Sequence, residues 1–194
     1  MFKKILEYIT NLWYVIDGRG GYEMRDRITA YDVANWFLWY NQVQQMKYES
    51  DNDNYDVYEG LTHLKIQKLL YYADGLNLVI NNNPLFKEKI YAWPHGPVVR
   101  EVYEKLSGYG RNEINFDINE FAKIQKMNSD NSLYDLLVSV YDNYAGYTAW
   151  QLREKSHVAG GPWQITVDTK GMQKEIDAKL IKRYFEKIVK VENE

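Results

Sequence analysis

Apolar side chains recur along most of the chain at intervals of three and four positions, a spacing that predicts helices with one buried face. Helices are expected over roughly residues 2–16, 30–46, 63–80, 98–106, 132–144, 149–157 and 174–191. Alternation typical of a strand is confined to residues 88–93. The pattern predicts a mainly α, single-domain helical bundle with at most a small β-hairpin or short strand near residues 88–93.

Capping residues predict where several of these helices begin. Thr29 with Asp32, and Thr148 with Gln151, have the spacing of reciprocal capping boxes. Thr62 can cap the helix that follows it. The apolar stripe of that helix is Leu64, Leu69, Tyr72, Ala73, Leu76 and Val79. The last helix is expected to bury Ile176, Leu180, Tyr184, Phe185 and Ile188.

Glycine, proline and polar residues mark the connections between the predicted helices. The glycines of residues 17–21 end the first predicted helix. This helix belongs to an amphipathic arm over residues 1–27, which precedes a domain over residues 28–194. Residues 47–60 are polar and acidic, and we expect an exposed loop there. A rigid turn is expected over residues 94–97, with Pro97 at the first position of the next helix.

The composition narrows the functional classes. With 45% hydrophobic and 26% charged residues, the sequence is that of a folded globular protein. The absence of cysteine excludes disulfides, thiolate metal sites and cysteine nucleophiles, and it fits a reducing compartment. A net charge of -3 gives no sign of nucleic-acid binding. No apolar stretch is long enough to span a membrane and no signal-peptide cleavage site follows the N-terminus, so we expect a cytoplasmic protein.

No pattern in the chain predicts a metal ion or a cofactor. The acidic residues 51–62 lack the glycine and the final carboxylate of a calcium loop. None of the three histidines has the paired spacing of zinc ligands. We expect His63 on the surface of a first helical turn, His95 bonded to nearby backbone in a turn, and His157 at an exposed helix end.

One alternative is enzymatic. Arg153 and His157 lie at the end of the predicted helix over 149–157, where an arginine and a histidine could activate a ribose hydroxyl. The pair superficially resembles the arginine–histidine motif of the HEPN nucleases, but only three residues separate the two here, whereas that family keeps four to six. A helical ribonuclease or another small enzyme using Arg153 and His157 is therefore the second hypothesis.

A series of short aromatic motifs carries a family resemblance. They are Tyr31–Leu38 (YDVANWFL), Leu61–Ala73 (LTHLKIQKLLYYA), Pro84–Phe86 (PLF), Ala92–Val99 (AWPHGPVV), Val102–Tyr103, Thr148–Leu152 (TAWQL), Ser156–His157 and Pro162–Trp163. In this order and spacing they resemble the Panacea family, whose members include SocA-like antitoxins and phage-associated proteins. The resemblance extends from about residue 28 to residue 167.

The resemblance implies a protein-binding antitoxin, not an enzyme, that neutralises a cognate toxin, usually encoded beside it. In one branch of the family the antitoxin delivers its toxin to a protease, so a protease or chaperone could join the complex. The family establishes no catalytic residue. Its signature residues in this chain, which we expect to be mostly structural, are Leu64, Gln67, Lys68, Tyr71, Tyr72, Trp93, His95, Gly96, Pro97, Tyr103, Trp150, Leu152, His157, Pro162 and Trp163.

Two segments depart from the family pattern. The arm over residues 1–27 precedes the matching region, and residues 47–60 lengthen a loop. The apolar stripe of the arm could pack on the core, lie on a membrane, or contact a second copy. Both segments could also contact the toxin. The identity of the toxin, the surface that binds it and the oligomeric state, including a homo-oligomer, are left open by the sequence.

Overall fold

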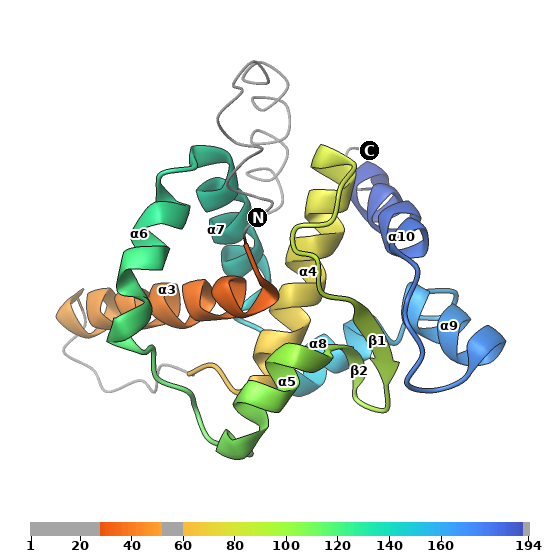
Figure 1. Ribbon diagram of the computed structural model, residues 1–194, viewed down its shortest axis with the longest axis horizontal. Helices are drawn as coiled ribbons and strands as arrows, with labels where there is room; N and C mark the ends of the chain where they lie inside the picture. The colour runs from red at the N-terminus through yellow and green to blue at the C-terminus, as the bar shows by residue number, and fades with distance from the viewer. Residues whose placement is uncertain (1–27, 52–59, 192–194) are drawn as a thin grey trace.

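A computed structural model describes residues 28–51 and 60–191 and shows a mainly α fold, as predicted (Figure 1). The helices of the described residues are α3 (Ala30–Asp51), α4 (His63–Asn81), α5 (Arg100–Leu106), α6 (Phe121–Asn128), α7 (Asn131–Tyr144), α8 (Ala149–Ser156), α9 (Pro162–Lys170) and α10 (Ala178–Val191). Two short 3-10 helices, η1 (Ser107–Tyr109) and η2 (Ile118–Glu120), flank the loop between α5 and α6. The predicted helix over residues 2–16 lies outside the described residues, as does most of the predicted loop over 47–60.

Helix α4 runs through the middle of the molecule (Figure 1). It packs against α3, α7, α8, α10 and the hairpin, and every residue from Lys65 to Leu78 is buried. The prediction that only one face of this helix is buried is therefore wrong. Leu64 is only half-buried, whereas the polar Gln67 and Lys68 lie inside. A helix surrounded on all sides loses the amphipathic pattern, so its polar residues must find buried partners.

The β-hairpin consists of β1 (Ile90–Trp93) and β2 (Gly96–Val99), paired antiparallel. Pro97 lies within β2 opposite Ala92, and α5 begins only at Arg100, so the prediction that Pro97 starts a helix is wrong. Contacts from α4 explain the extended backbone. The side-chain amide of Gln67 accepts from the Val99 N–H at 2.7 Å and donates to the Val99 carbonyl at 3.3 Å. These bonds occupy the backbone polar groups of Val99.

The other edge of the hairpin explains where the last helix begins. The Ile176 N–H donates to the Ile90 carbonyl at 2.8 Å, and the Gln173 N–H donates to the Ala92 carbonyl at 2.7 Å. Because residues 173–176 pair with β1, they cannot join the helix, and α10 starts at Ala178 instead of residue 174. Ile176 and Phe185 are buried as predicted. Leu180, Tyr184 and Ile188 are only half-buried, and the fully buried residue that the prediction missed is Ile181.

Capping predictions agree with the structure. Thr29 and Asp32 exchange side-chain bonds with each other's backbone N–H, at 2.8 and 3.2 Å. The Thr62 hydroxyl accepts from the Lys65 N–H, and Thr148 and Gln151 form the capping box of α8. These local motifs are visible in sequence because each depends on residues three positions apart.

One helix is longer than predicted, and two more were missed. Helix α3 continues to Asp51, five residues past the predicted end, so residues 47–51 are helical and not loop. Helices α6 and α9 were not predicted. Pro162 occupies the first turn of α9, a position where its missing N–H costs nothing. Among the described residues, no helix combines the length and the apolar character needed to cross a membrane.

Candidate functional site

Several signature motifs of the sequence meet where the first half of α4, the hairpin and the end of α8 pack together. Five polar side chains lie at this junction, and we name them the Lys68 cluster. They are His63, Lys68, Arg153, Ser156 and His157. They come from two helices that are far apart in sequence.

Lys68 is the centre of the cluster. Its side chain is fully buried, and its Nζ donates to the Pro97 carbonyl at 2.9 Å. Gly96 passes directly over it with a φ of 102°. A Cβ on Gly96 would lie 2.7 Å from Lys68 Nζ and 2.8 Å from Ser156 Oγ. Both the backbone angle and the lack of space therefore require glycine at this position.

The end of α8 forms the opposite wall. The Ser156 hydroxyl donates to the Arg153 carbonyl at 2.7 Å, and His157 Nδ1 lies 2.6 Å from the same oxygen. A carbonyl can only accept, so Nδ1 of His157 is the protonated ring nitrogen. The His157 ring packs on Trp163 with centroids 3.8 Å apart, and the Trp163 indole donates to the Trp93 carbonyl at 2.8 Å. These contacts fix the histidine between α9 and the hairpin.

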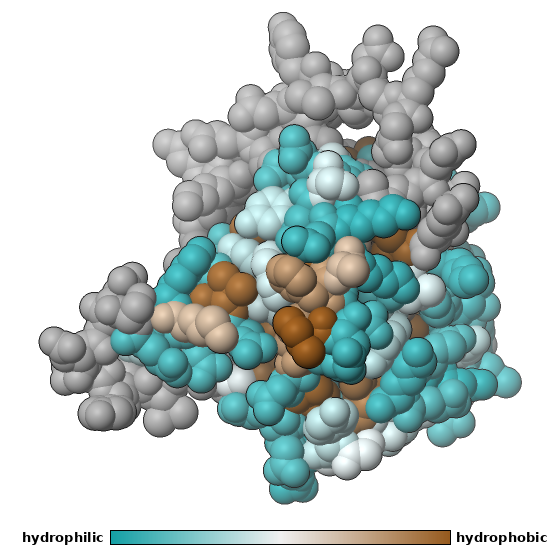
Figure 2. Space-filling model, turned by 60° about the vertical axis from the view of Figure 1, so that its left-hand side comes forward, coloured by the Kyte–Doolittle hydropathy of each residue, from teal (hydrophilic) through white to brown (hydrophobic). Residues whose placement is uncertain are grey.

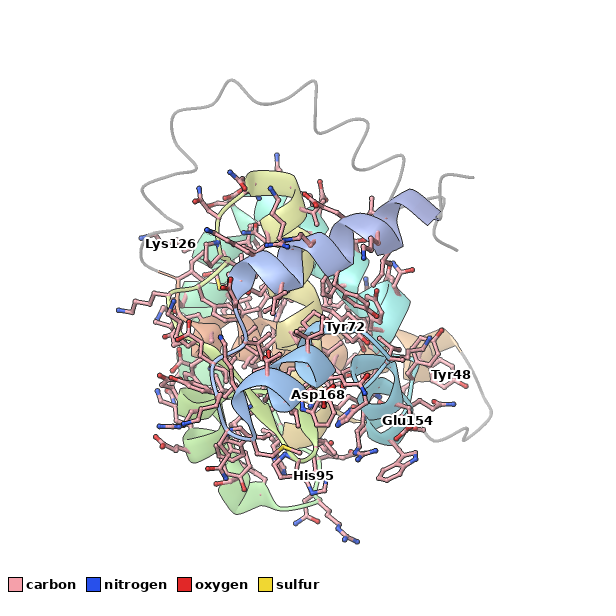
Figure 3. All side chains as sticks on the ribbon, turned by 90° about the vertical axis from the view of Figure 1, so that its right-hand side faces the viewer. Tyr48, Tyr72, His95, Lys126, Glu154 and Asp168 are labelled. Atoms are coloured by element: carbon pink, nitrogen blue, oxygen red, sulfur yellow. The ribbon has the colours of Figure 1, made fainter. Side chains whose placement is uncertain are left out.

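Tyr103 of α5 closes the remaining side of the junction. Its ring lies 5.6 Å from the His63 ring and 4.9 Å from the Trp93 ring, measured between centroids. His63 is consequently half-buried instead of lying on the surface as predicted. His157 is also half-buried, and the predicted exposed helix end is wrong for the same reason: aromatic rings cover it. His95 lies at the exposed tip of the hairpin (Figure 3).

The surroundings of the cluster favour the neutral forms of Lys68, His63 and His157. Burial, and to a smaller extent repulsion from Arg153, lowers the pKa of Lys68 to about 7. Burial also lowers the pKa of His63, with a further contribution from Lys68. The pKa of His157 is lowered mainly by burial, although the carbonyls of Arg153 and Pro94 oppose the shift. Each of these shifts follows from moving a cation away from water and next to other cations.

Several hydrogen-bonding groups around the cluster are buried without a partner among the described residues. They are His63 Nδ1, Trp93 Nε1, Arg153 Nε and His157 Nε2. The rest of the Arg153 guanidinium is better placed, because it stacks over the Trp150 ring at 4.7 Å and pairs with Glu154. Buried N–H groups in proteins nearly always have an acceptor.

The other signature residues lie in different surroundings. Leu152 and Pro162 are buried, and Tyr72 stacks on Tyr144 with ring centroids 3.8 Å apart in the interior. Tyr71 is buried against Phe185. In contrast, Trp150 is 62% exposed on α8. Sequence reasoning identified these residues as a set, but it did not show that Trp150 faces solvent.

A second feature of the surface is hydrophobic. Met46 of α3, Ile118 of η2 and Phe121 of α6 are exposed, Ile118 by 70%. Figure 2 shows hydrophobic side chains gathered on this side of the molecule among hydrophilic ones. A pocket of about 220 Å³, lined in part by Met46 and Phe116, lies beside them. We name Met46, Phe116, Ile118 and Phe121 the α3–α6 face. Sequence patterning missed it because the segment from 111 to 128 has no clear periodicity.

Within residues 28–51 and 60–191, no three histidine or acidic side chains gather closely enough to hold a metal ion. The bases of the Lys68 cluster lie beside a serine and two tryptophans, with one carboxylate, Glu154, at the solvent edge. This arrangement can donate hydrogen bonds to an acceptor, and it can hold protons near neutral pH.

Comparison with known proteins identifies the family that the chain matches. Residues 66–164, just over half of the chain, match the family described as "Antitoxin SocA-like, Panacea domain". The chain is 31% identical to antitoxin SocA of Caulobacter vibrioides over 120 residues, which cover 57% of this chain and 62% of that protein. It is 33% identical to a lactaldehyde dehydrogenase of Methanococcus aeolicus over 88 residues, 44% of this chain but 17% of that protein. The chain thus spans less than two thirds of either relative. No solved structure matches it.

Proposed function

The chain belongs to the antitoxin SocA-like, Panacea domain family, and we propose that it neutralises a cognate protein toxin by binding it directly. The observation that carries the proposal is the family match over residues 66–164. That range includes Lys68, Arg153, Ser156 and His157, so the junction of α4, the hairpin and α8 belongs to the shared part of the fold. The identity to antitoxin SocA supports the same function.

We place the toxin on the α3–α6 face. Exposed apolar side chains that gather on one surface are typical of protein-binding sites. Ile118 and Phe121 project from this surface, and the pocket beside Met46 and Phe116 can receive a side chain of the partner. Residues 47–51 of α3 adjoin Met46, so the segment by which the chain departs from the family pattern is next to the same surface.

Delivery of the toxin to a protease is a second part of the proposal. An adaptor must bind its toxin and a protease at the same time, so the two surfaces must be separate. Trp150, exposed on α8 and stacked under Arg153, is our candidate for the second contact. Trp and Arg are enriched among residues that dominate binding energy at interfaces.

Co-expression tests the function. The chain and the product of the neighbouring gene are produced together, and toxicity and co-purification are measured. We expect the neighbour to arrest growth alone, to be harmless with the chain, and to co-purify with it. Ile118→Glu should weaken co-purification at least about tenfold, since it places a charge in an apolar contact. Met172→Glu changes another exposed apolar residue outside this face and is the matched control.

The enzymatic alternative has its own test. Arg153 and His157 belong to one cluster, and Nδ1 of His157 is already held by the Arg153 carbonyl. RNA cleavage by the purified chain that disappears in His157→Ala would support a ribonuclease; no cleavage with several divalent metals would reject it. For the dehydrogenase we propose no shared activity, because the matched segment is only 17% of that protein.

A further inference from the structure

The Lys68 cluster gathers four groups that can carry positive charge, with one carboxylate at its edge. Lys68, Arg153, His63 and His157 lie close enough for Lys68 to be repelled by Arg153, and for both histidines to be repelled by Lys68. The carboxylate that contacts the cluster among the described residues is Glu154. It pairs with Arg153 but is 56% exposed, at the outer edge. No acidic group of the described residues opposes the shift of Lys68.

Hydrogen-bond donors in the cluster also exceed acceptors. The ammonium of Lys68 has three N–H groups, of which one is used by the Pro97 carbonyl. Arg153 Nε and the Trp93 indole nitrogen can only donate, and both are buried without an acceptor among the described residues. An arrangement of unpaired donors beside unbalanced cations is complementary to a negatively charged oxygen group.

The cluster is not sealed from solvent. Arg153 has 23% of its side chain exposed, and His63, Trp93 and His157 are each half-buried. Lys68 and Ser156 are buried beneath Gly96. Because Gly96 has no side chain, its backbone can approach these two side chains and leaves them side by side.

We propose that the Lys68 cluster is a binding site for a compact oxyanion, a phosphate or a carboxylate. Lys68 and Arg153 would supply the charge, and the Trp93 indole would supply a neutral donor. The anion could be a free small ion or the carboxylate of a partner's side chain.

Binding should be coupled to protonation. Lys68 attracts an anion only as the ammonium form, and the anion in turn favours that form. Because the pKa of Lys68 is about 7, affinity should fall as the pH rises from 6 to 8. The groups that face Lys68 reinforce this trend: His63 and His157 also lose charge as the pH rises, whereas Arg153 stays charged.

The test is a titration of the full-length chain with inorganic phosphate and, separately, with acetate, followed by NMR. The signals are the Trp93 indole N–H and the ring protons of His63 and His157. We expect saturable shifts with at least one of the anions, with His95 at the hairpin tip as an internal reference that does not respond. Tighter binding of phosphate would indicate a phosphate source, and tighter binding of acetate a carboxylate source.

Variants distinguish a specific binding site from a general attraction of anions to positive charge. Lys68→Met keeps an unbranched buried side chain and should weaken binding at least about tenfold. Arg153→Met should also weaken binding. It replaces Lys68→Met as the test if circular dichroism shows that Lys68→Met does not fold. Lys155→Met removes an exposed lysine of the same helix and should leave binding unchanged. Unchanged signals with both anions, or equal affinity in Arg153→Met and the unaltered chain, would overturn the proposal.

Discussion

Two buried titratable side chains of α4 have opposite effects on how the free energy of unfolding changes with pH. Burial lowers the pKa of Lys68 to about 7 and raises the pKa of Asp74 to about 7, although a bond from the Leu85 N–H and the charge of Lys89 oppose the shift of Asp74. Above pH 7 the unfolded chain holds a proton on Lys68 that the folded chain has lost, so stability from this group rises with pH. Between about pH 4 and 7 the folded chain holds a proton on Asp74 that the unfolded chain has lost, so stability from that group falls with pH.

These opposite pH dependences give the first prediction. Each group contributes at most about 1.4 kcal/mol per pH unit within its window. Relative to the unaltered chain, Lys68→Met should therefore lose stability between pH 7 and 9, and Asp74→Asn should gain stability between pH 5 and 7. Urea unfolding at each pH measures both differences. If the free energy of unfolding changed with pH in the same way for all three proteins, the burial of Lys68 and Asp74 would be contradicted.

Gly96 yields the second prediction. Gly96→Ala forces a side chain onto Lys68 and Ser156 at a positive φ. Gly171 also has a positive φ, 88°, but a Cβ there would meet nothing within 4 Å, so Gly171→Ala measures backbone strain alone. We expect Gly96→Ala to be less stable than Gly171→Ala by about 1–3 kcal/mol, the cost of overpacking. Equal losses in thermal or urea unfolding would show that Lys68 and Ser156 move aside freely.

At the scale of elements, the packing of α10 on α4 depends on one small residue. A Cβ on Gly75 would lie 2.3 Å from the Phe185 ring, so the two helices can approach only if this position has no side chain. The aromatic cluster of Tyr71, Tyr72 and Phe185 then fills the interface, with Phe185 5.4 Å from Tyr71 and 5.9 Å from Tyr72 between ring centroids. This contact joins the end of the described chain to its centre.

The third prediction tests that approach. Alanine has the better helix propensity by about 1 kcal/mol, so an unconstrained helical Gly→Ala change would stabilise. Gly75→Ala should instead destabilise by about 1–3 kcal/mol through overpacking. Gly146→Ala, where a Cβ would meet nothing within 4 Å, is the control and should be nearly neutral. A stabilised Gly75→Ala variant would contradict the close packing of α4 and α10.

Sequence predicted some elements well and others poorly, for physical reasons. The caps at Thr29, Thr62 and Thr148 depend on neighbours three residues away, and they are confirmed. The conformation of Pro97 depends on Gln67 and β1, far away in sequence, and local turn chemistry mispredicted it. Similarly, residues 174–177 resemble the start of a helix, yet pairing of residues 173–176 with β1 prevents one.

For the whole molecule, the family could be identified from sequence because the order of its motifs is specific, and the match confirms it. The site could not be derived in the same way. His63, Lys68 and His157 meet only because α8 returns to α4 across the hairpin, and burial of a lysine leaves no sign in the sequence. The α3–α6 face was missed because the exposure of Ile118 depends on its neighbours in space.

We further propose that residues 28–194 fold as one unit, which gives a fourth prediction. The buried core of the described residues includes side chains from α3 to α8 and from α10, and Trp163 and Val167 of α9 pack against it, which is the mark of a single cooperative unit. Deleting residues 1–27 should therefore leave a helical circular-dichroism spectrum and a single cooperative thermal transition. Loss of cooperative melting would place those residues in the core.

We propose that this chain binds and neutralises a toxin. The most direct measurement combines growth rescue with co-purification for the chain and its neighbouring gene product, comparing Ile118→Glu with Met172→Glu. We expect rescue and a stable complex with the unaltered chain and with Met172→Glu, and loss of both with a folded Ile118→Glu variant. A neighbour that is harmless alone and does not co-purify would contradict this function.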